Sequence, residues 1–455
     1  MKKCLILICL CLVGFIGLVR ADDVDQRVKT LEDRLNLLEK SQGPKGMSAY
    51  WDRGLKIDSL DQRFQMSIGG RMYWDTAFVS ADDSLKSQFS SGKANFLMPD
   101  GTEFRTIRLE TEGLIYRKVE FSLSVDLVAE EDKETENVES VNKIKDAYMG
   151  LVDLPWVGNL RVGYIKEPFS LEELTSSKYG SFMERSLANA FAPGRHSGIL
   201  FQNNIFDKRA TWAAGAFANT DDYGFKQNSY GGEYNGTGRL TVLPVYKEDG
   251  KKLIHMGLDY SYRKPNKNND RDNVVSYDTR PEADLVGKLD GTGDIMTTGR
   301  VQLIGTELAA IYGPLSFQGE FTEALLDVAL ATAPSHFFGY SLQASYFLTG
   351  ESKNYKRSSA KFGATDPSKN FGDDDGGKGA WEVAVRYSKI DLNDNDGVNR
   401  ELKASSRRGG VLSDVTVGLN WYLNPLTRVM MNYVYSDLQN IGIARILQTR
   451  VQVSF

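Results

Sequence analysis

The chain has 455 residues, a formal net charge of −5, and a high content of glycine and aromatic residues, with 43 Gly, 21 Tyr and 22 Phe. This length suits about three ordinary soluble domains. Apolar patterning continues throughout the chain, which excludes an intrinsically disordered protein. Only the run over 4–19 is apolar enough to cross a membrane as a helix, which excludes a helical membrane bundle. The acidic balance argues against nucleic acid as a partner.

Residues 1–21 have the features of a signal peptide. Lys2 and Lys3 precede the apolar run, and Val19-Arg20-Ala21 offers a cleavage site after Ala21. A retained membrane anchor is the alternative, although the run is short for a full span. Cleavage would remove all three cysteines, at positions 4, 9 and 11, and leave 52 basic and 60 acidic residues. The mature chain would then carry no thiol for catalysis or for a disulfide.

Residues 22–42 are expected to form a short heptad helix. Apolar residues recur at 4-3-4-3 spacing, with charged residues between them, at Val24, Val28, Leu31, Leu35 and Leu38. Two heptads are too few to be stable alone, so either this helix lies against the rest of the protein or it forms a small coiled coil in an oligomer. The Gly43-Pro44 pair ends the pattern and begins a linker, expected over 43–60.

From about residue 61 onward the apolar period changes to two. In 119–127, Val119, Phe121 and Leu123 alternate with polar residues, and the segment 447–455 shows the same pattern. Successive strand side chains point to opposite faces, so such segments have one apolar and one polar face. A soluble sandwich would produce the same alternation. Segments of about ten residues, with aromatic residues near their ends, favour a transmembrane barrel instead.

We predict an all-β fold, a transmembrane antiparallel β-barrel over 61–455 that follows the short N-terminal α-helix. About sixteen strands are expected, at 63–79, 103–113, 117–129, 143–153, 158–167, 196–204, 208–219, 235–247, 252–263, 299–312, 314–327, 336–348, 379–390, 411–423, 426–437 and 443–455. Long polar links alternate with tight turns, as in bacterial outer-membrane barrels. The segment 349–378 is long on the tight side, which indicates either a missed hairpin or a specialised turn. An even strand number would leave both termini, and the helix, in the periplasm.

Several long strings resemble one family. The segment GYIKEPFSLEELTSSKYGSFMERSLANAFAPGRHSGI (163–199) is similar to the centre of the phosphate-selective porin O and P family, and 341–352, 379–392 and 416–434 resemble its C-terminal blocks in the same order. The resemblance implies a sixteen-stranded trimeric outer-membrane porin in which loops fold into the lumen and basic side chains guide anions. In one place the chain departs from the family, which often has adjacent basic residues entering the second strand: here Thr106 follows Arg105.

Candidate residues for an anion path come from strand parity and from the loop 168–195. Parity places several arginines on inward faces, and the loop adds basic residues at or near its ends. The candidates are Arg71, Arg108, Arg161, Lys166, Arg185, Arg195, Arg239 and Arg386. A guanidinium stays charged and offers a fork of donors that matches phosphate oxygens. The alternative is that these cations only pair with inward carboxylates such as Glu110, Glu120 and Glu307, and that the loop is solvated outside the barrel.

Enzymatic functions find no supporting motif. The three histidines, His196, His255 and His336, are scattered without metal-ligand spacing, and no nucleotide-binding or nucleophile motif appears in a suitable context. We therefore expect no enzyme, no cofactor and no metal. The expected function is an outer-membrane porin that forms a water-filled channel for small anions, with phosphate selectivity as its sharper form. The expected partners are outer-membrane lipid, small anions such as phosphate, and two further copies of the chain. A weakly selective porin of the same fold and a structural or adhesive barrel remain the alternatives.

Overall fold

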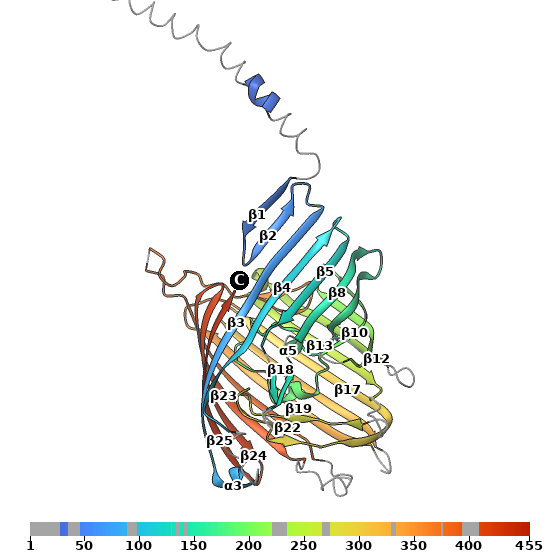
Figure 1. Cartoon of the computed structure of the whole chain (residues 1–455), viewed down its shortest axis with the longest axis vertical. Coiled ribbons are helices and arrows are strands. Elements are labelled where there is room, and N and C mark those ends of the chain that lie inside the picture. Colours follow the sequence, from blue (N-terminus) through green and yellow to red (C-terminus); the bar gives the residue numbers. More distant parts are fainter. Residues whose placement is uncertain are drawn as a thin grey trace, which may run out of the picture.

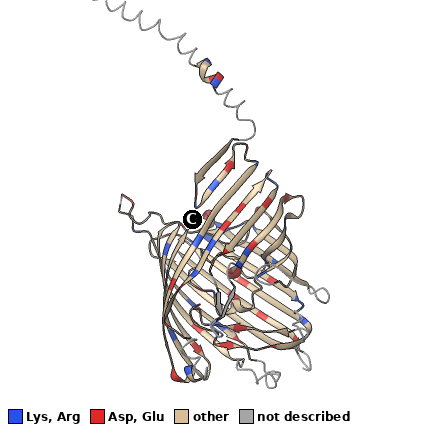
Figure 2. Ribbon diagram, in the orientation of Figure 1, with Lys and Arg blue, Asp and Glu red and all other residues tan. Residues whose placement is uncertain are grey.

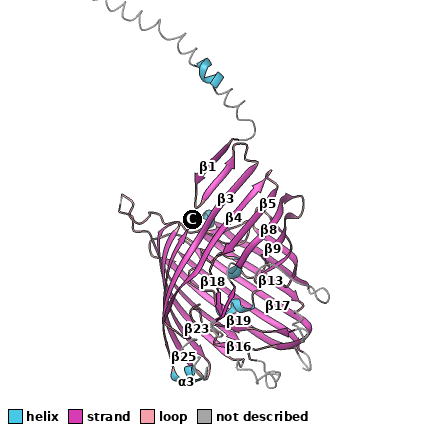
Figure 3. Ribbon diagram, in the orientation of Figure 1, coloured by secondary structure: helices cyan, strands magenta, loops and turns pink. Residues whose placement is uncertain are grey.

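The computed structural model describes residues 28–34, 46–88, 98–128, 130–132, 137–140, 143–220, 234–265, 274–328, 334–374, 376–393 and 409–455. Strands dominate these residues and form one tilted, closed wall (Figures 1 and 3). Among the residues described, no helix combines the length and apolar character needed to cross a membrane. The predicted signal peptide lies outside the described residues.

Sixteen strands in the described part of the chain make up the barrel wall. They are β3 (Phe64–Ala81), β4 (Gly101–Ile115), β5 (Val119–Asp126), β8 (Lys143–Leu154), β9 (Gly158–Lys166), β10 (Arg195–Ile205), β11 (Ala210–Ala218), β12 (Tyr234–Lys247), β13 (Lys252–Arg263), β17 (Ile295–Tyr312), β18 (Leu315–Val328), β19 (Ser335–Phe347), β22 (Ala380–Asp391), β23 (Val411–Asn424), β24 (Thr427–Leu438) and β25 (Gly442–Ser454). Each pairs antiparallel with the next, and β25 closes the ring on β3 from Ala444↔Ala81 to Ser454↔Arg71. The predicted sixteen-stranded antiparallel barrel is confirmed.

Side-chain parity in the strands also agrees with the sequence. In β3, Tyr73 and Asp75 face the lumen with 1% and 3% of their surface exposed, whereas the intervening Trp74 points outward with 42% exposed. The outer surface of the barrel is therefore apolar and suited to lipid, while the lumen receives the polar side chains.

The two ends of the barrel differ in the length of their connections. At one end, which we call the short-turn end, all but one of the connections between wall strands are brief turns, and the chain enters β3 and finishes at Phe455 there. One such turn, between β4 and β5, has positive φ at both Tyr116 and Arg117, as tight antiparallel hairpins require. The opposite, long-loop end carries the longer connections and the helix α3 (Asp83–Gln88) (Figure 1).

The expected linker 43–60 contains a hairpin. Its strands β1 (Met47–Trp51) and β2 (Leu55–Ser59) pair with each other, and β2 extends the sheet beside the start of β3, from Gln65 to Ile68. The hairpin projects beyond the barrel at the short-turn end (Figure 1). Of the predicted N-terminal helix, residues 28–34 are described and are helical.

Two connections fold into the lumen. The inward loop (167–194) contains α5 (Leu171–Leu174) and η1 (Leu187–Phe191), whose residues are largely buried. The inward turn (348–379) joins β19 to β22 at the short-turn end, and its first part enters the lumen, whereas most of 366–374 is exposed. The part in the lumen contains the small pair β20 (Tyr355–Lys356) and β21 (Lys361–Phe362), and α5 contacts β21. This small hairpin was not predicted from the sequence, but β20 and β21 form a separate sheet and add no strand to the wall, so 349–378 is also a specialised turn.

Apolar residues fill part of the lumen near the long-loop end. The alternation in the sequence predicted polar residues on the inner face of every strand, so this apolar filling was not predicted. Inward side chains such as Leu326, Phe337 and Ile390 are 0% exposed and pack under Leu187 and Phe191 of η1. The short strands β14 (Val274–Val275), β15 (Asp278–Thr279) and β16 (Asp290–Gly291) belong to the neighbouring connection, which also covers this core. Because this side of the lumen is filled, open space remains on the opposite side.

Candidate functional site

The open side of the lumen holds a cavity of about 920 Å³. Its walls come mainly from β3, β4, β5, β8, β9, β10 and β11, from the inward loop and from the inward turn, and single residues of β12, β18, β19, β22 and β25 also line it. Seventeen Lys and Arg residues line it, against seven Asp and Glu. Basic and acidic residues are interspersed along the strands (Figure 2). Because the whole chain is acidic, with a net charge of −5, the positive excess of the cavity is local.

All eight candidate residues from the sequence line this one cavity, and each also pairs with a carboxylate. The pairs are Arg71–Glu110, Arg108–Asp126 (2.7 Å), Arg161–Glu120 (2.8 Å), Lys166–Glu173 (2.8 Å), Arg185–Glu173 (2.8 Å), Arg195–Asp146 (2.9 Å), Arg239–Glu307 (2.7 Å) and Arg386–Glu172 (3.1 Å). The structure thus combines the two alternatives drawn from the sequence, because the same cations line the cavity and have acidic partners.

Hydrogen bonds to the wall hold the inward loop in place. Ser170 caps α5 by accepting from the amide of Glu173 (3.1 Å), and its hydroxyl donates to Glu320 of β18 (2.7 Å). Farther along, Ser181 donates to Glu382 of β22 (2.6 Å), and Arg450 of β25 donates to the carbonyl of Met183 (2.6 Å). These contacts keep the loop inside the barrel, and a loop solvated outside the barrel is not what the structure shows.

Two of the candidate arginines are also anchors. Arg386 is 1% exposed and donates to the carbonyl of Glu184 in the inward loop (2.8 Å). Arg239 is 5% exposed and donates to the carbonyl of Ala360 in the inward turn (2.9 Å). These backbone contacts orient the two guanidinium groups toward the folded-in segments, so their substitution would disturb the shape of the cavity as well as its charge.

Acidic residues of the inward loop stay ionised because cations surround them. Burial by itself raises the pKa of Glu173, but Arg185 and Lys166 outweigh it and lower that pKa to about 2. Burial likewise opposes ionisation of Glu167, and Arg263 together with His196 lowers its pKa to about 2. Both carboxylates therefore offset part of the positive charge at any physiological pH.

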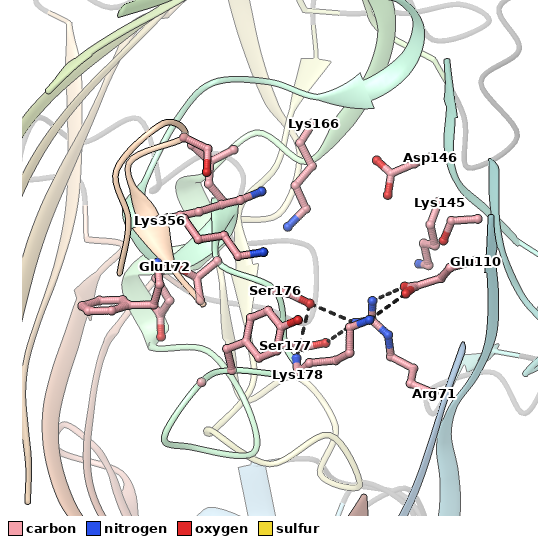
Figure 4. Close-up of a pocket in the computed structure, with 18 of the residues that line it drawn as sticks. Arg71, Glu110, Lys145, Asp146, Lys166, Glu172, Ser176, Ser177, Lys178 and Lys356 are labelled. Carbon is pink, nitrogen blue, oxygen red and sulfur yellow. Dashed lines mark hydrogen bonds and ion pairs between the residues drawn. The ribbon is translucent and has the colours of Figure 1, made fainter. Parts of the chain in front are cut away.

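The inward turn adds cations that the sequence analysis did not select. Lys353, Lys356 and Lys361 line the cavity, and Figure 4 shows the amine of Lys356 directed into it near Lys166. Among the described residues, Lys356 and Lys361 make no ion pair with a carboxylate. Burial beside Arg161 and Lys356 lowers the pKa of Lys361 to about 8. The length and the lysine content of this turn were visible in the sequence, but its entry into the lumen was not.

Further cations of the cavity were also missed as site residues. Arg105 pairs with Glu184 of the inward loop (3.1 Å), and Lys178 of that loop pairs with Glu110 of the wall (2.8 Å). Arg450 pairs with Asp75 (2.6 Å) and is 2% exposed. The sequence indicates the inward parity of Arg105 and Arg450 and the loop position of Lys178. Only the folding of the loop brings these three residues to the same cavity as the eight candidates.

The arrangement suits weak, repeated binding of anions. The lining offers guanidinium and ammonium donors together with hydroxyl groups such as those of Ser176 and Ser177. Low-dielectric walls strengthen the attraction of an anion to the excess positive charge. The internal carboxylates limit that attraction, which favours passage over permanent binding.

The sequence of this chain is similar to those of known porins. Residues 69–455 match the family model described as phosphate-selective porin O and P. The chain is 26% identical to Porin O of Pseudomonas aeruginosa over 425 residues, which cover 85% of this chain and 86% of that protein. It is 29% identical to an uncharacterized protein of Caulobacter vibrioides over 402 residues, covering 86% of this chain and 71% of that protein.

Solved structures show the same fold at low sequence identity. The outer membrane channel DcaP of Acinetobacter baumannii aligns with a TM-score of 0.51 and 11% identity, covering 88% of this chain and 99% of that one. OprB of Pseudomonas putida aligns with a TM-score of 0.50 and 10% identity, covering 87% and 95%.

Proposed function

This chain belongs to the phosphate-selective porin O and P family, and from that premise we propose that its lumen conducts small anions across the bacterial outer membrane, phosphate among them. The observation that carries the proposal is the cavity, in which seventeen basic residues face seven acidic ones within a barrel whose outer surface is apolar. Family and structural relatives are channels, which supports transport without catalysis.

Phosphate fits the donors of the cavity. Its oxygens accept from guanidinium forks and from ammonium groups, and charge-assisted hydrogen bonds are roughly twice as strong as neutral ones. Lys166 and Arg195 lie where the inward loop leaves and rejoins the wall, and Arg185 lies within the loop. Arg71 and Arg108 lie on β3 and β4. An anion in the cavity would therefore find basic groups both on the wall and on the inward loop.

Planar-bilayer recording tests the proposal. A gradient of KCl should give a reversal potential that indicates anion preference, and added phosphate should block chloride current. Replacement of Lys166 or Arg185 by Glu should abolish or reverse the preference. The effect should shrink at high salt, because mobile ions screen charges over about 3 Å at 1 M.

A charge reversal outside the cavity serves as the control for this test. Lys118→Glu makes the same charge change in the short turn between β4 and β5, outside the residues that line the cavity, and should leave ion preference unchanged. If both lumen reversals behave like the control, the cations serve as structural partners of Glu173, and a weakly selective porin becomes the better description. The pairing of every candidate cation with a carboxylate is the observation that favours this second function. Absence of conductance would instead favour a structural barrel.

The orientation and assembly of the protein follow from the same proposal. The short-turn end would face the periplasm, because bacterial barrels place short turns there. The hairpin β1–β2 and the helix at 28–34, which precede β3, would then lie in the periplasm as well. A homotrimer, expected from the family, would place three such helices close enough to form a small bundle.

A further inference from the structure

Glu110 connects the barrel wall to the inward loop through two cations. It lies on β4 and faces the cavity with 25% of its side chain exposed. Its carboxylate accepts from Arg71 of β3 and from the ammonium group of Lys178 in the loop (2.8 Å). Arg71 also donates to the hydroxyl groups of Ser177 (3.0 Å) and Ser176 (3.3 Å). Figure 4 shows these groups together at one side of the cavity.

A carboxylate in this position acts on the same donors that a passing anion would use. Phosphate and carboxylate oxygens accept from guanidinium and ammonium groups in similar geometry. While Glu110 binds both cations, an anion must displace it or share the remaining donor directions. The partly exposed carboxylate can turn away from one cation without leaving the water of the cavity, so displacement does not leave a buried charge unsolvated.

Glu112 provides an internal comparison on the same strand. It follows Glu110 by two residues, so it has the same parity, and it lines the same cavity. Within the described residues it makes no ion pair with a Lys or Arg. The two side chains therefore carry the same charge into the same space and differ in whether they bind the cations there.

We propose that Glu110 is a specificity-determining residue, a tethered anion that competes with the permeating phosphate for Arg71 and Lys178 and so keeps phosphate binding weak enough for release. This inference rests on the proposed function. Transport requires a site that attracts the ion but does not retain it, and a tethered competitor meets that requirement without removing the cations that attract the ion.

The test compares Glu110→Gln with Glu112→Gln in the full-length protein reconstituted in planar bilayers. The quantity measured is the concentration of inorganic phosphate that blocks half of the chloride current. Glu110→Gln should lower it about tenfold or more, because even a unit charge about 12 Å from the anion, at an effective dielectric constant near 20, contributes on the order of one factor of ten. Glu112→Gln should lower it by about twofold, the effect of a more distant, screened charge.

A double substitution separates competition from a general field. In the Lys178→Gln background only Arg71 remains to be freed, so Glu110→Gln should tighten the block clearly less than it does in the wild type. Glu110→Asp keeps the charge but shortens the side chain, and it should give an intermediate block. Thermal unfolding of each variant in detergent shows whether the barrel is intact, and Glu110→Asp remains as a test if Glu110→Gln fails to fold.

Several outcomes would overturn the inference. Equal effects of Glu110→Gln and Glu112→Gln would mean that Glu110 contributes only its charge. A weaker phosphate block in Glu110→Gln would mean that Glu110 serves to hold the loop. An undiminished effect in the Lys178→Gln background would mean that Glu110 acts through a general field and not by competition for the cations. If the wild-type channel shows neither anion preference nor phosphate block, the proposed function fails first, which is a distinguishable result.

Discussion

Single residues in this lumen rarely act alone, because nearly every strand arginine that faces the cavity has an acidic partner. Arg108 with Asp126 and Arg195 with Asp146 are typical. Such pairs hold the guanidinium groups in fixed positions but cancel much of their charge. The uncompensated charge comes from the excess of basic residues, to which Lys356 and Lys361 of the inward turn contribute without an ion pair in the described structure.

Lys361 should make ion preference depend on pH. Burial, Arg161 and Lys356 lower its pKa to about 8, with Asp146 acting in the opposite direction. Its positive charge is therefore present below that pH and lost above it, so anion preference should fall between pH 7 and pH 9. Reversal potentials recorded across this range check the expectation. Lys361→Arg stays charged and should abolish the decline, whereas a decline that persists in this variant would assign the titration to another group.

At the scale of elements, the strands separate an outer apolar face from an inner polar one. Val417 of β23 is 52% exposed and points outward, while its neighbour Thr416 is 0% exposed and faces the lumen. Val417→Arg should therefore destabilise the barrel by about 2–4 kcal/mol if the residue lies near the bilayer midplane. Reversible unfolding in lipid vesicles measures this free energy. The apolar control Val417→Leu should be close to neutral, and equal stability of the two variants would contradict lipid exposure.

The inward turn is an element whose removal should change conduction without breaking the wall. Phe347 of β19 pairs with Glu382 of β22, and the amide of Leu348 donates to the carbonyl of Trp381 (2.7 Å), so the two strands already meet where the turn leaves the wall. Replacement of residues 350–378 by Asn-Gly, a favoured hairpin turn, should preserve the barrel. Single-channel conductance should rise and anion preference should fall, because Lys353, Lys356 and Lys361 leave the lumen.

Circular dichroism and heat resistance of the turn deletion serve as its folding controls. Unchanged conductance in a folded variant would show that the turn does not narrow the path. An unchanged anion preference would assign selectivity to the wall and to the inward loop alone.

For the whole molecule, closure of the sheet explains why such a barrel is stable although part of its lumen is an open cavity. The last residue completes the ring: the amide of Phe455 donates to the carbonyl of Gly70 (3.0 Å). A Cβ atom at position 70 would lie 2.6 Å from the backbone carbonyl oxygen of Arg108 and 2.9 Å from the ring of Phe455, so a glycine is needed at this close approach. A closed ring leaves no free strand edge within the membrane, where an unpaired backbone group is costly.

Assembly is the prediction that belongs to this scale. The intact protein should be a trimer in native mass measurement, with the helical segment near its N-terminus as an accessory contact. Deletion of residues 22–41 should leave a trimer, because a two-heptad seam is too short to hold three barrels together. A monomeric mass for the intact protein would contradict the assembly, and a monomer in the deletion alone would show that the helix drives it.

The sequence by itself determined the barrel, its strands and the faces of its side chains. A period of two over segments of about ten residues is a local property, so the strands, the alternation of long loops and short turns, and the inward position of Arg71 or Arg386 could be predicted without any knowledge of tertiary contacts. The family strings added the position of the inward loop. The hairpin at 47–59 was not predicted, because its two strands are five residues each and lie in a region without clear alternation.

Only the tertiary structure decided which side of the lumen is open and which charges remain uncompensated there. The apolar inward residues Leu326 and Phe337 look like errors of alternation until η1 covers them. The pairing of Glu110 with both Arg71 and Lys178 joins positions up to 107 residues apart in the chain, and the lysines of the inward turn reach the cavity only because that turn folds back. Such contacts depend on closure of the barrel and on packing between distant segments, which leave no periodic signal in the sequence.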